Sequence, residues 1–388
     1  MAEVASRGAL DGIRVIELAS YVSGPYAGML LADFGAEVIK IEPPVHGDPF
    51  RGWGQTEYSA TFGSVNRNKK SVVLDLKTEV GQAAAHDLIA GADIVVENFR
   101  PGTLERLGLG YDKCRATNPR LIWCSITGFG DFGPRADQPG YDTVGQAMGG
   151  LLSLLTDMDA PKPMGISFAD HLAGMVACNG ILAALQARHV TGKGQRVDTS
   201  LLESIISFMG ENVARYFETG KVPNRATRTH TAQVFAFVAG DGRPFVIHLS
   251  SPEKFWRGLL QVVGRPQWKD DPRFNPRKAR QKNYDVLHQG LSEIFATKNR
   301  QHWLALLSEA DVPASALNDF AELFEEPQVQ ALEMRVRVPH PTLGEVELIR
   351  NGARLSDTPA RIDNCSPELG RHNAELLGAA SRMKGTQR

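Results

Sequence analysis

The residue with the clearest chemical potential is Asp170, which stands at the start of an apolar stretch with helical periodicity, after a short loop that contains Gly165. An aspartate in this place is most often a helix N-cap, whose side chain accepts hydrogen bonds from free backbone N–H groups. A helix N-terminus also favours an ionised carboxylate, and an ionised carboxylate can act as a nucleophile. Position alone favours the cap, although the two roles are compatible.

A second motif, at residues 128–133, matches the Gly-x-Gly-x-x-Gly spacing of dinucleotide-binding loops. It follows a stretch at 121–126 that is typical of a β-strand. In such sites a helix begins at the glycines, so that its N-terminus faces the pyrophosphate. Residues 134–140 contain two prolines and a glycine and are typical of a loop. We therefore expect no nicotinamide or flavin site here.

The composition is that of a globular enzyme, with 42% hydrophobic and 22% charged residues in a chain of 388. The formal net charge of −1 gives no basic field, so nucleic acid is not expected as a partner. The four cysteines, Cys114, Cys124, Cys178 and Cys365, form no CxxC pair and no zinc-ligand cluster with histidine. We expect reduced thiols, no metal site and a cytoplasmic location.

No membrane anchor is expected either. The N-terminal residues have neither the basic nor the apolar region of a signal peptide. The most apolar helical stretch, at 172–187, is shorter than a bilayer requires and is interrupted by Gly174, Asn179 and Gly180.

The first half of the chain alternates between strand and helix patterns. Strands are predicted at 13–18, 37–41, 71–76, 94–96, 121–126 and 196–198, and helices at 26–34, 80–89, 170–188 and 200–216. Such alternation predicts an α/β fold, in which helices cover both faces of a parallel sheet as in Rossmann-like domains.

The pattern changes after residue 220. Residues 224–231 are polar and basic, as in a linker, and a β-hairpin is predicted from 234–238 and 245–249. Helices follow near 252–263, 283–295 and 299–310, then strands at 336–338 and 346–349 and a helix beginning near 371. We predict a large domain over 1–220, a smaller α+β domain over 225–325, and a C-terminal segment, 330–388, that returns to the large domain.

A series of motifs in one order resembles the family III CoA-transferases, also called the CaiB/BaiF family. The resemblance covers almost the whole chain and is weakest between residues 225 and 330. It rests on residues 24–27, 31–42, 68–71, 74–77, 96–102, 140–142, 168–170, 191–195 and 370–372. The resemblance implies that Asp170 is the catalytic nucleophile.

The resemblance also implies which residues contact coenzyme A, which is a substrate here and not a permanently bound cofactor. Val22 and Ser23 are expected along the pantetheine. Arg106 is expected on a phosphate, where its guanidinium suits the charge. Further contacts are implied for Leu74, Lys77, Asn98, Phe99, Arg100 and Tyr141. Arg67, Lys69 and Lys70 form a second basic group, although such a run is more often a solvated loop.

The implied reaction is a ping-pong transfer of CoA from an acyl-CoA to a free carboxylic acid, through an aspartyl anhydride and an aspartyl-CoA thioester. Each step passes through an oxyanion, which calls for backbone donors. The glycine pair Gly149-Gly150 is a candidate, although such pairs usually only make turns.

The sequence departs from some relatives at two places. Pro43 replaces an arginine that contacts the nucleotide in some members. The run of glycines that covers the nucleophile in oxalate-using formyl-CoA members is missing between 225 and 330, which argues against oxalate. Dicarboxylates are nevertheless favoured, and Arg51, Arg225 and Arg228 are basic candidates for binding them.

The principal alternative is an α-methylacyl-CoA racemase of the same fold. Those enzymes use a His/Asp pair as base, but the histidine position is Tyr141 here, and His171 points differently from its neighbour Asp170 on a helix. A dehydrogenase and a non-catalytic CoA-binding protein remain as further alternatives. The predicted large domain is interrupted by more than about 100 residues, so a tail that returns to it would leave a ring-like opening in the chain. The resemblance implies that a second subunit is threaded through this opening, which gives an interlocked homodimer.

Overall fold

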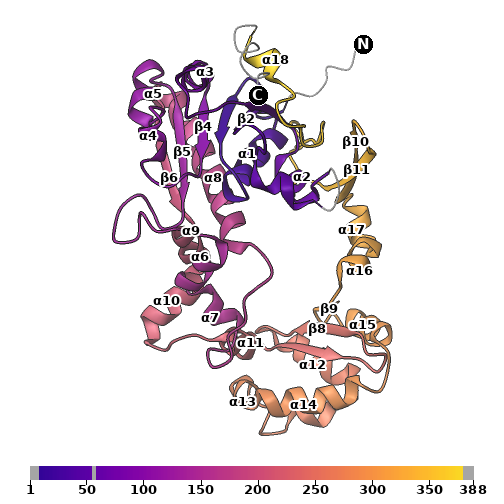
Figure 1. Ribbon diagram of the computed structural model, residues 1–388. Coiled ribbons are helices and arrows are strands. Elements are labelled where there is room, and N and C mark those ends of the chain that lie inside the picture. The colour runs from indigo at the N-terminus through magenta and orange to yellow at the C-terminus, as the bar shows by residue number, and fades with distance from the viewer. Residues whose placement is uncertain (1–7, 55–57, 379–388) are drawn as a thin grey trace. The chain divides into compact units, whose positions relative to one another are not determined.

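The computed structural model describes residues 8–54 and 58–378 (Figure 1). The chain divides into two compact units. Unit 1 consists of Met1–Leu151, Pro163–Val213 and Leu332–Arg388, and unit 2 of Leu152–Lys162 and Ala214–Ala331. Compared with the predicted boundaries, the short segment Leu152–Lys162 belongs to the smaller unit.

Unit 1 is built on a six-stranded sheet with the order β3-β2-β1-β4-β5-β6, in which every pair is parallel. The strands are β1 (Arg14–Leu18), β2 (Glu37–Glu42), β3 (Lys69–Val73), β4 (Ile94–Glu97), β5 (Ile122–Thr127) and β6 (Arg196–Ser200). This order confirms the predicted Rossmann-like parallel sheet. The order reverses between β1 and β4, and ligands bind at such a switch point in open α/β sheets.

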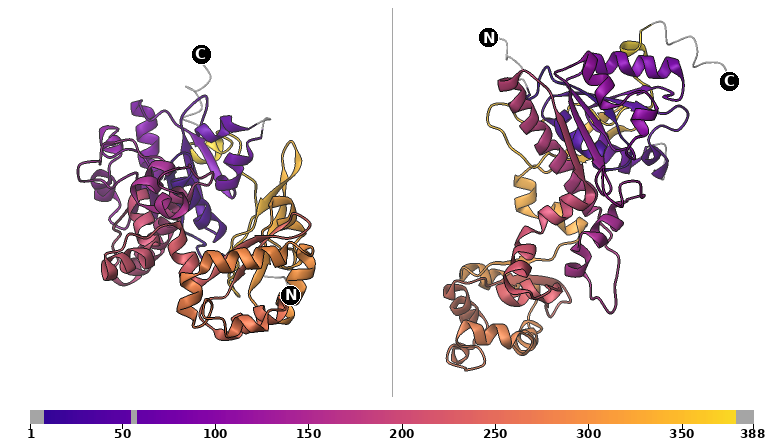
Figure 2. Two further views of the ribbon diagram at one scale, coloured as in Figure 1. Left: turned by 90° about the horizontal axis from the view of Figure 1, so that it is seen from below. Right: turned by 90° about the vertical axis from the view of Figure 1, so that its left-hand side faces the viewer.

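Helices cover both faces of the sheet (Figures 1 and 2). They include α1 (Ser23–Asp33), α3 (Glu79–Ala90), α4 (Thr103–Arg106), α5 (Tyr111–Thr117) and α8 (Phe168–Thr191). Successive side chains along each strand point to opposite faces of the sheet. Ile16 and Ile39 belong to the core beneath α3, α4 and α5, whereas Glu17 and Lys40 are buried on the α1 side.

Helix α8 corrects the expectation of a short, interrupted stretch, because it is continuous over 24 residues. By length and hydropathy it could cross a membrane, and among the described residues it alone could do so. Its residues Ala173, Ala177 and Ile181 are nevertheless buried in unit 1. A side chain at Gly174 would meet the Ser23 carbonyl at 2.7 Å, and one at Gly180 would meet Val197 at 2.6 Å. The glycines thus allow close packing of a core helix.

Several other elements differ from the predicted ones. Residues 224–231 are no linker, because α11 (Arg225–Ala232) is a helix with a capping box made by Asn224 and Thr227. The single helix predicted at 200–216 is two helices, α9 (Leu201–Phe208) and α10 (Gly210–Thr219). The remaining helices of this half are α2 (Ala60–Asn66), α6 (Asp142–Met148) and α7 (Leu151–Leu155), with the 3₁₀ helix η1 (Pro49–Trp53). The glycine motif is confirmed as a loop, since residues 128–141 contain no helix and the next helix, α6, begins at Asp142.

Unit 2 contains the predicted hairpin, β7 (Val234–Val238) and β8 (Pro244–His248), extended by β9 (Ala314–Ala316). Its core includes Phe235, Phe245, Trp256, Leu291 and Phe295. The helices are α12 (Glu253–Val262), η2 (Pro266–Lys269), α13 (Arg277–Lys282), α14 (Tyr284–Phe295), α15 (Arg300–Glu309), α16 (Phe320–Glu325) and α17 (Pro327–Ala331).

The last part of the chain packs on unit 1 at the edge strand β3. It contains the hairpin β10 (Arg335–His340) and β11 (Gly344–Ile349), followed by α18 (Asn373–Leu376). The N–H of Ser71 donates to Nδ1 of His372 at 3.1 Å, and the N–H of His372 donates to the Ser71 carbonyl at 3.0 Å. Asn373 Oδ1 accepts from the N–H of Val73 at 2.8 Å. These bonds occupy backbone groups that an edge strand would otherwise leave open.

Candidate functional site

Asp170 lies in the first turn of α8, and the residue before the helix is Ser167, which makes no capping hydrogen bond with its side chain. The reading of Asp170 as an N-cap is therefore wrong. Instead, Asp142 Oδ1 accepts hydrogen bonds from the N–H groups of Ala169 at 2.8 Å and Asp170 at 3.2 Å. The Asp170 side chain is thus not used for capping, and it lines a cavity.

Burial and the nearby charge of Asp142 raise the pKa of the Asp170 carboxyl to about 7. Removal from water penalises the charged form, and a like charge adds to the penalty. A carboxylate with this pKa is a better nucleophile and base than an exposed one, and a substantial fraction is ionised at neutral pH. The geometry therefore suits covalent chemistry at Asp170.

Asp142 is a functional candidate that the sequence analysis missed. Its second oxygen accepts from Nε2 of Gln146, which is completely buried and also donates to the Ile166 carbonyl at 2.9 Å. This arrangement ties α6 to the loop before α8. The available signal was the spacing of Asp142 and Gln146 by four residues, which places both on one face of a helix.

The cavity beside Asp170 has a volume of about 340 Å³ and is formed by loops that follow β1, β4 and β5, and by the segment before α6. It therefore includes the switch point of the sheet. It brings together most of the residues implied by the resemblance, namely Val22, Ser23, Asn98, Phe99, Arg100, Tyr141 and Asp170.

Asn98 organises this cavity from the side of β4. Its Oδ1 accepts from the N–H of Ser20 at 3.0 Å, and its Nδ2 donates to the Ser20 carbonyl at 2.8 Å and the Ser23 hydroxyl at 3.3 Å. The side chain of Asn98 thus holds the loop between β1 and α1. This loop contains both residues predicted to lie along the pantetheine.

Three predicted CoA contacts do not line the cavity. Leu74 is buried in the core with Ile41 and Val72, which leaves only its backbone for a ligand. Lys77 and Arg106 are exposed in unit 1. Arg106 donates to the Thr103 hydroxyl at 3.0 Å, so its guanidinium retains free donors for a phosphate.

The second basic group is structural, which corrects both readings given to it. Arg67 is buried and pairs with Asp33 through two hydrogen bonds of 2.9 and 2.6 Å. Lys69 is also buried, beside Glu17 at 2.8 Å and the Pro25 carbonyl at 2.7 Å. Lys70 pairs with Glu37 at 2.8 Å. None of these three is a solvated loop residue or a free phosphate ligand.

Most of the groups predicted to bind the acid or the oxyanion already have hydrogen-bond or ion-pair partners within the protein. Arg51 makes two bonds of 2.7 Å with Glu42 and stacks on the ring of Phe62. Arg225 pairs with Asp157 at 3.1 Å within unit 2, whereas Arg228 is exposed. The N–H groups of Gly149 and Gly150 donate to carbonyls of α6, so this pair is no oxyanion site.

Glu97, at the end of β4, is a second carboxyl with an elevated pKa. It lines a cavity of about 160 Å³ that shares Arg100, Pro101 and Thr127 with the first. Burial raises the pKa of Glu97 to about 7, although bonds from the Ser125 hydroxyl and the Phe99 N–H favour its charged form. Any titration of this region near neutral pH therefore has two candidate carboxyls.

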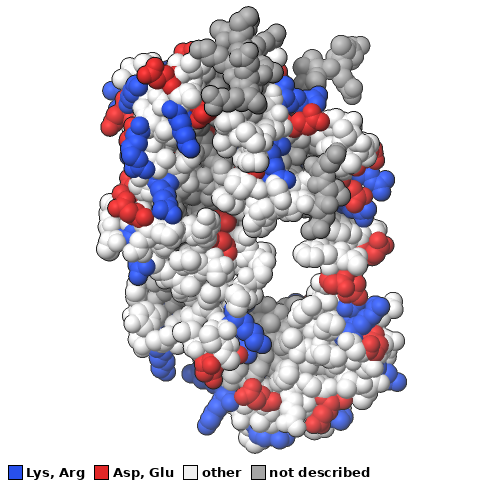
Figure 3. Space-filling model, in the orientation of Figure 1, with Lys and Arg blue, Asp and Glu red and all other residues white. Residues whose placement is uncertain are grey.

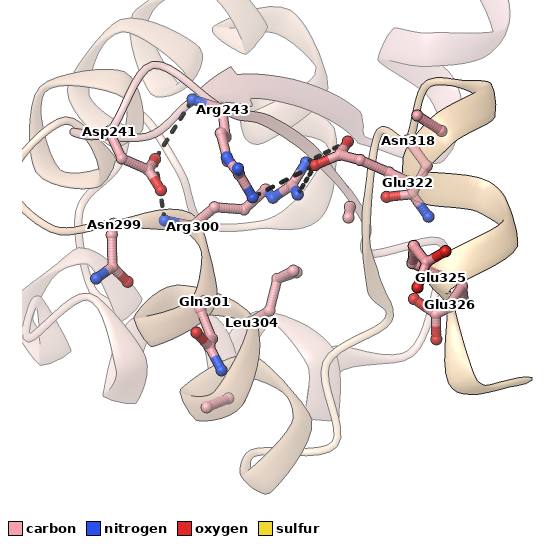
Figure 4. A pocket seen from close by; sticks show the side chains of 13 residues that line it. Asp241, Arg243, Asn299, Arg300, Gln301, Leu304, Asn318, Glu322, Glu325 and Glu326 are labelled. Atoms are coloured by element: carbon pink, nitrogen blue, oxygen red, sulfur yellow. Dashed lines mark hydrogen bonds and ion pairs between the residues drawn. The ribbon is translucent and has the colours of Figure 1, made fainter.

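Unit 2 contains a larger cavity, of about 780 Å³, whose two arginines are both paired with an acidic side chain (Figure 4). Arg300 and Arg243 are both directed at Glu322, at 2.5 and 3.4 Å. Asp241 accepts from the N–H groups of Arg243 and Arg300. No group here is arranged as a nucleophile with its base, so the Asp170 cavity remains the candidate site.

Within residues 8–54 and 58–378, no group of three or more His, Cys, Asp or Glu side chains is arranged to hold a metal ion. On the face drawn in Figure 3, basic and acidic side chains are interspersed and form no extended patch of one sign.

Comparisons with protein families, with curated sequences and with solved structures all indicate the same family. The model of CoA-transferase family III matches residues 10–373. The chain is 38% identical to succinyl-CoA--D-citramalate CoA-transferase of Chloroflexus aurantiacus, over 95% of this chain and 93% of that protein. It is 38% identical to acetyl-CoA:oxalate CoA-transferase of Acetobacter aceti, over 97% and 96%. It is similar in structure to a CAIB/BAIF family protein from Brucella suis, with a TM-score of 0.85, 36% identity and coverage of 98% and 100%.

Proposed function

The chain belongs to CoA-transferase family III, and from this premise we propose that it transfers coenzyme A between carboxylic acids with Asp170 as the covalent nucleophile. The observation that carries the proposal is the position of Asp170. Its half-buried carboxyl lines the cavity at the switch point, with a pKa of about 7, together with six residues expected to contact CoA. Coenzyme A is a substrate in this scheme, and no permanently bound cofactor is required.

The first half of the reaction loads CoA onto the enzyme. The Asp170 carboxylate attacks the thioester carbonyl of the donor, the C–S bond breaks, and CoA leaves as a thiolate. The thiolate then attacks the aspartyl carbonyl of the mixed anhydride, and the first acid leaves as its carboxylate. Each acylated state of Asp170 is neutral, so forming it relieves the repulsion from Asp142.

The second half runs the same steps in reverse with the acceptor acid. The acceptor carboxylate attacks the aspartyl thioester and releases the CoA thiolate. The thiolate attacks the acceptor acyl carbon of the new anhydride, and the Asp170 carboxylate is regenerated. Water must be excluded throughout, because it would hydrolyse either intermediate. The Asp170 side chain is half-buried in the cavity, which limits the access of water to it.

We propose short dicarboxylates as the preferred acids, as the names of both cited relatives suggest. The argument against oxalate rests on the missing glycine run alone, and the Acetobacter aceti protein acts on oxalate. Oxalate therefore belongs among the acids tested. Because Arg51 is engaged by Glu42, we no longer assign it to the acid.

The racemase alternative is weaker in this geometry. The Nδ1–H of His171 donates to the Ser167 carbonyl at 2.8 Å, and the ring packs on Tyr26. It does not line the cavity, and the sequence resemblance puts Tyr141 where the racemases have their histidine. Tyrosine is a poor base at neutral pH.

We further propose a cytoplasmic homodimer, with subunits interlocked as the sequence resemblance implies. The proposal is supported by the path of the chain, which leaves unit 1 after Val213 and returns to it at Leu332.

One experiment tests the function. The purified full-length protein is incubated with acyl-CoA donors and short acids, including oxalate, and new acyl-CoA is detected by mass spectrometry. Transfer to a second acid supports the proposal. Exchange of the α-proton in deuterated water, with a single branched acyl-CoA and no acid, would instead support the racemase.

A further inference from the structure

Tyr21 has an unusual backbone for an aromatic residue. It lies in the loop between β1 and α1, and its φ is +65°, in the left-handed region that bulky side chains rarely adopt. Glycine or asparagine would meet this geometry with less strain. A strained residue that persists in a ligand-binding loop points to a use for its side chain.

Hydrogen bonds and a buried ion pair hold this backbone conformation of Tyr21. The N–H of Tyr21 donates to Asp48 Oδ1 at 3.3 Å, which also accepts from the N–H of Phe50 at 2.9 Å. The other Asp48 oxygen pairs with Lys40 at 2.9 Å, and neither side chain is exposed. Lys40 also donates to the Ala19 carbonyl at 2.7 Å. A buried ion pair therefore anchors the loop two residues before Tyr21 and at Tyr21 itself.

The side chain of Tyr21 lines the same cavity as Asp170. Its ring packs edge-to-face on Phe50 at 5.5 Å and on Tyr141 at 6.1 Å. Burial raises the pKa of Tyr21 above its usual value. The phenol is therefore neutral at physiological pH. A neutral phenol in the cavity has an O–H that can donate a hydrogen bond to a ligand.

The cavity has few charged side chains that could bind the polar end of an acid, so a neutral hydrogen-bond donor is needed there. Among the described residues that line it, Asp170 is the carboxylate and Arg100 the basic side chain. CoA phosphates require a cation such as Arg100. Arg51 is engaged by Glu42 and lies outside this lining. Within unit 1, the polar end of a bound acid would therefore meet neutral donors of the lining, and Tyr21 is one of them.

We propose that Tyr21 is a specificity-determining residue for the acid exchanged at Asp170, and that its phenol, packed against Tyr141, donates a hydrogen bond to an oxygen-bearing substituent of a short dicarboxylic or hydroxycarboxylic acid. This inference rests on the proposed transfer reaction. The substrates of that reaction would then be polar acids that a tyrosine hydroxyl recognises by a hydrogen bond. Asp48 and Lys40 would act by positioning Tyr21.

The test uses acid pairs that differ in one group. Glutarate is compared with valerate, which has a methyl in place of the second carboxylate, and malate with succinate, which lacks the hydroxyl. Kcat/KM is measured for each acid with the donor selected by the screen above. The wild type should prefer the more polar acid of at least one pair. The pair concerned identifies the substituent as a carboxylate or a hydroxyl.

In Tyr21→Phe, the preference should fall about 10- to 100-fold for a carboxylate and about 2- to 10-fold for a hydroxyl, as loss of one hydrogen bond implies. Kcat/KM for the less polar acid should stay near the wild-type value. Tyr111→Phe is the matched control, because Tyr111 packs on Trp123 and does not line the cavity. It should leave both values unchanged.

Tyr21→Gly is a second variant, which removes the ring and suits the left-handed backbone. It should fold, by thermal unfolding, and lose the same preference. The inference is overturned by an unchanged preference in both variants, by an equal loss for both acids of a pair, or by a wild type that prefers the less polar acids. A wild type that transfers CoA to no acid defeats the proposed function itself.

Discussion

Asp142 caps the helix that carries Asp170, although the two residues are 28 positions apart in the chain. One oxygen of Asp142 accepts from the backbone N–H groups of Ala169 and Asp170, so it fixes the first turn of α8. The same carboxylate contributes, after burial, to the raised pKa of Asp170. One side chain thus fixes the position of the proposed nucleophile and adds to the effect of burial on its pKa.

Replacing Asp170 should abolish transfer. In Asp170→Asn the nucleophilic carboxylate becomes a poorly nucleophilic amide while the expected CoA contacts remain, so we expect less than a few per cent of the wild-type rate, as is usual for loss of a covalent nucleophile. CoA binding, measured by calorimetry, should persist. Hydroxylamine should trap an acyl or CoA adduct on Asp170 in the wild type alone. Retention of substantial activity would reject Asp170 as the nucleophile.

The same variant should change the pH dependence of stability. The pKa of Asp170 is about 7 in the folded protein, well above the ordinary value of 3.8. The folded state therefore binds more protons than the unfolded state between about pH 4 and 7, and wild-type stability falls as pH rises through that range. Asp170→Asn should have a higher Tm than the wild type at pH 8 and the same Tm near pH 3.5. A lower Tm at pH 8 would contradict the raised pKa.

Removing the charge of Asp142 should shift the pH profile of activity. Kcat/KM for acyl-CoA should rise with pH through about 7, because Asp170 must be ionised. Asp142→Asn keeps an oxygen to accept from α8 but removes the like charge, so the midpoint should move to lower pH. Glu97→Gln is the control for the second carboxyl with a pKa of about 7. If the midpoint is lost in Glu97→Gln and unmoved in Asp142→Asn, the titration belongs to Glu97.

Arg106→Ala should raise the KM for acyl-CoA by about 10- to 100-fold, as loss of a charge-assisted hydrogen bond implies. Kcat should change much less, because a contact far from the reacting carbonyl is made equally in the ground and transition states. Arg106 is exposed and outside the Asp170 cavity, in agreement with this separation. A collapsed kcat with an unchanged KM would place Arg106 at the chemistry.

Glu17→Gln should lower the free energy of unfolding by about 3–5 kcal/mol, the usual result of removing one partner from a buried ion pair. Glu17 bonds Lys40 at 2.9 Å and Lys69 at 2.8 Å, and all three side chains are inaccessible to solvent. Burial already lowers the pKa of Lys69 to about 8. Lys254→Gln, in the exposed pair with Asp311, is the control and should change stability by less than about 1 kcal/mol. Denaturant titration of both variants gives the comparison.

The protein should remain dimeric at any concentration at which it is folded, because interlocked subunits bury a large interface and leave no stable monomer. Analytical ultracentrifugation over a wide dilution range measures this. A folded, active species of half the dimer mass, at about nanomolar concentration, would disprove the interlocked arrangement.

Much of the fold could be predicted from local sequence. The β-branched runs at 13–18 and 37–41 and the helix between them follow from side-chain periodicity, which depends only on neighbours in the chain. Helix α11 was missed because its polar, basic residues have no apolar stripe. Its signal was the capping box of Asn224 and Thr227. The sequence predicts that Gly174 and Gly180 interrupt the helix. The structure shows that they instead allow close packing against Ser23 and Val197, which are distant in sequence from these glycines.

The site shows the same division. The sequence by itself determined the parallel sheet, the loop character of the glycine motif and, through motif resemblance, the choice of Asp170, since each depends on residue types in a fixed order. Only the tertiary structure decided that Asp142 caps α8, that Arg67 and Lys69 are buried ion-pair partners, and that Tyr21 faces the cavity. Burial and charge pairing are properties of groups brought together from distant segments, and no local pattern specifies whether a lysine or a tyrosine will find a partner, solvent or a ligand.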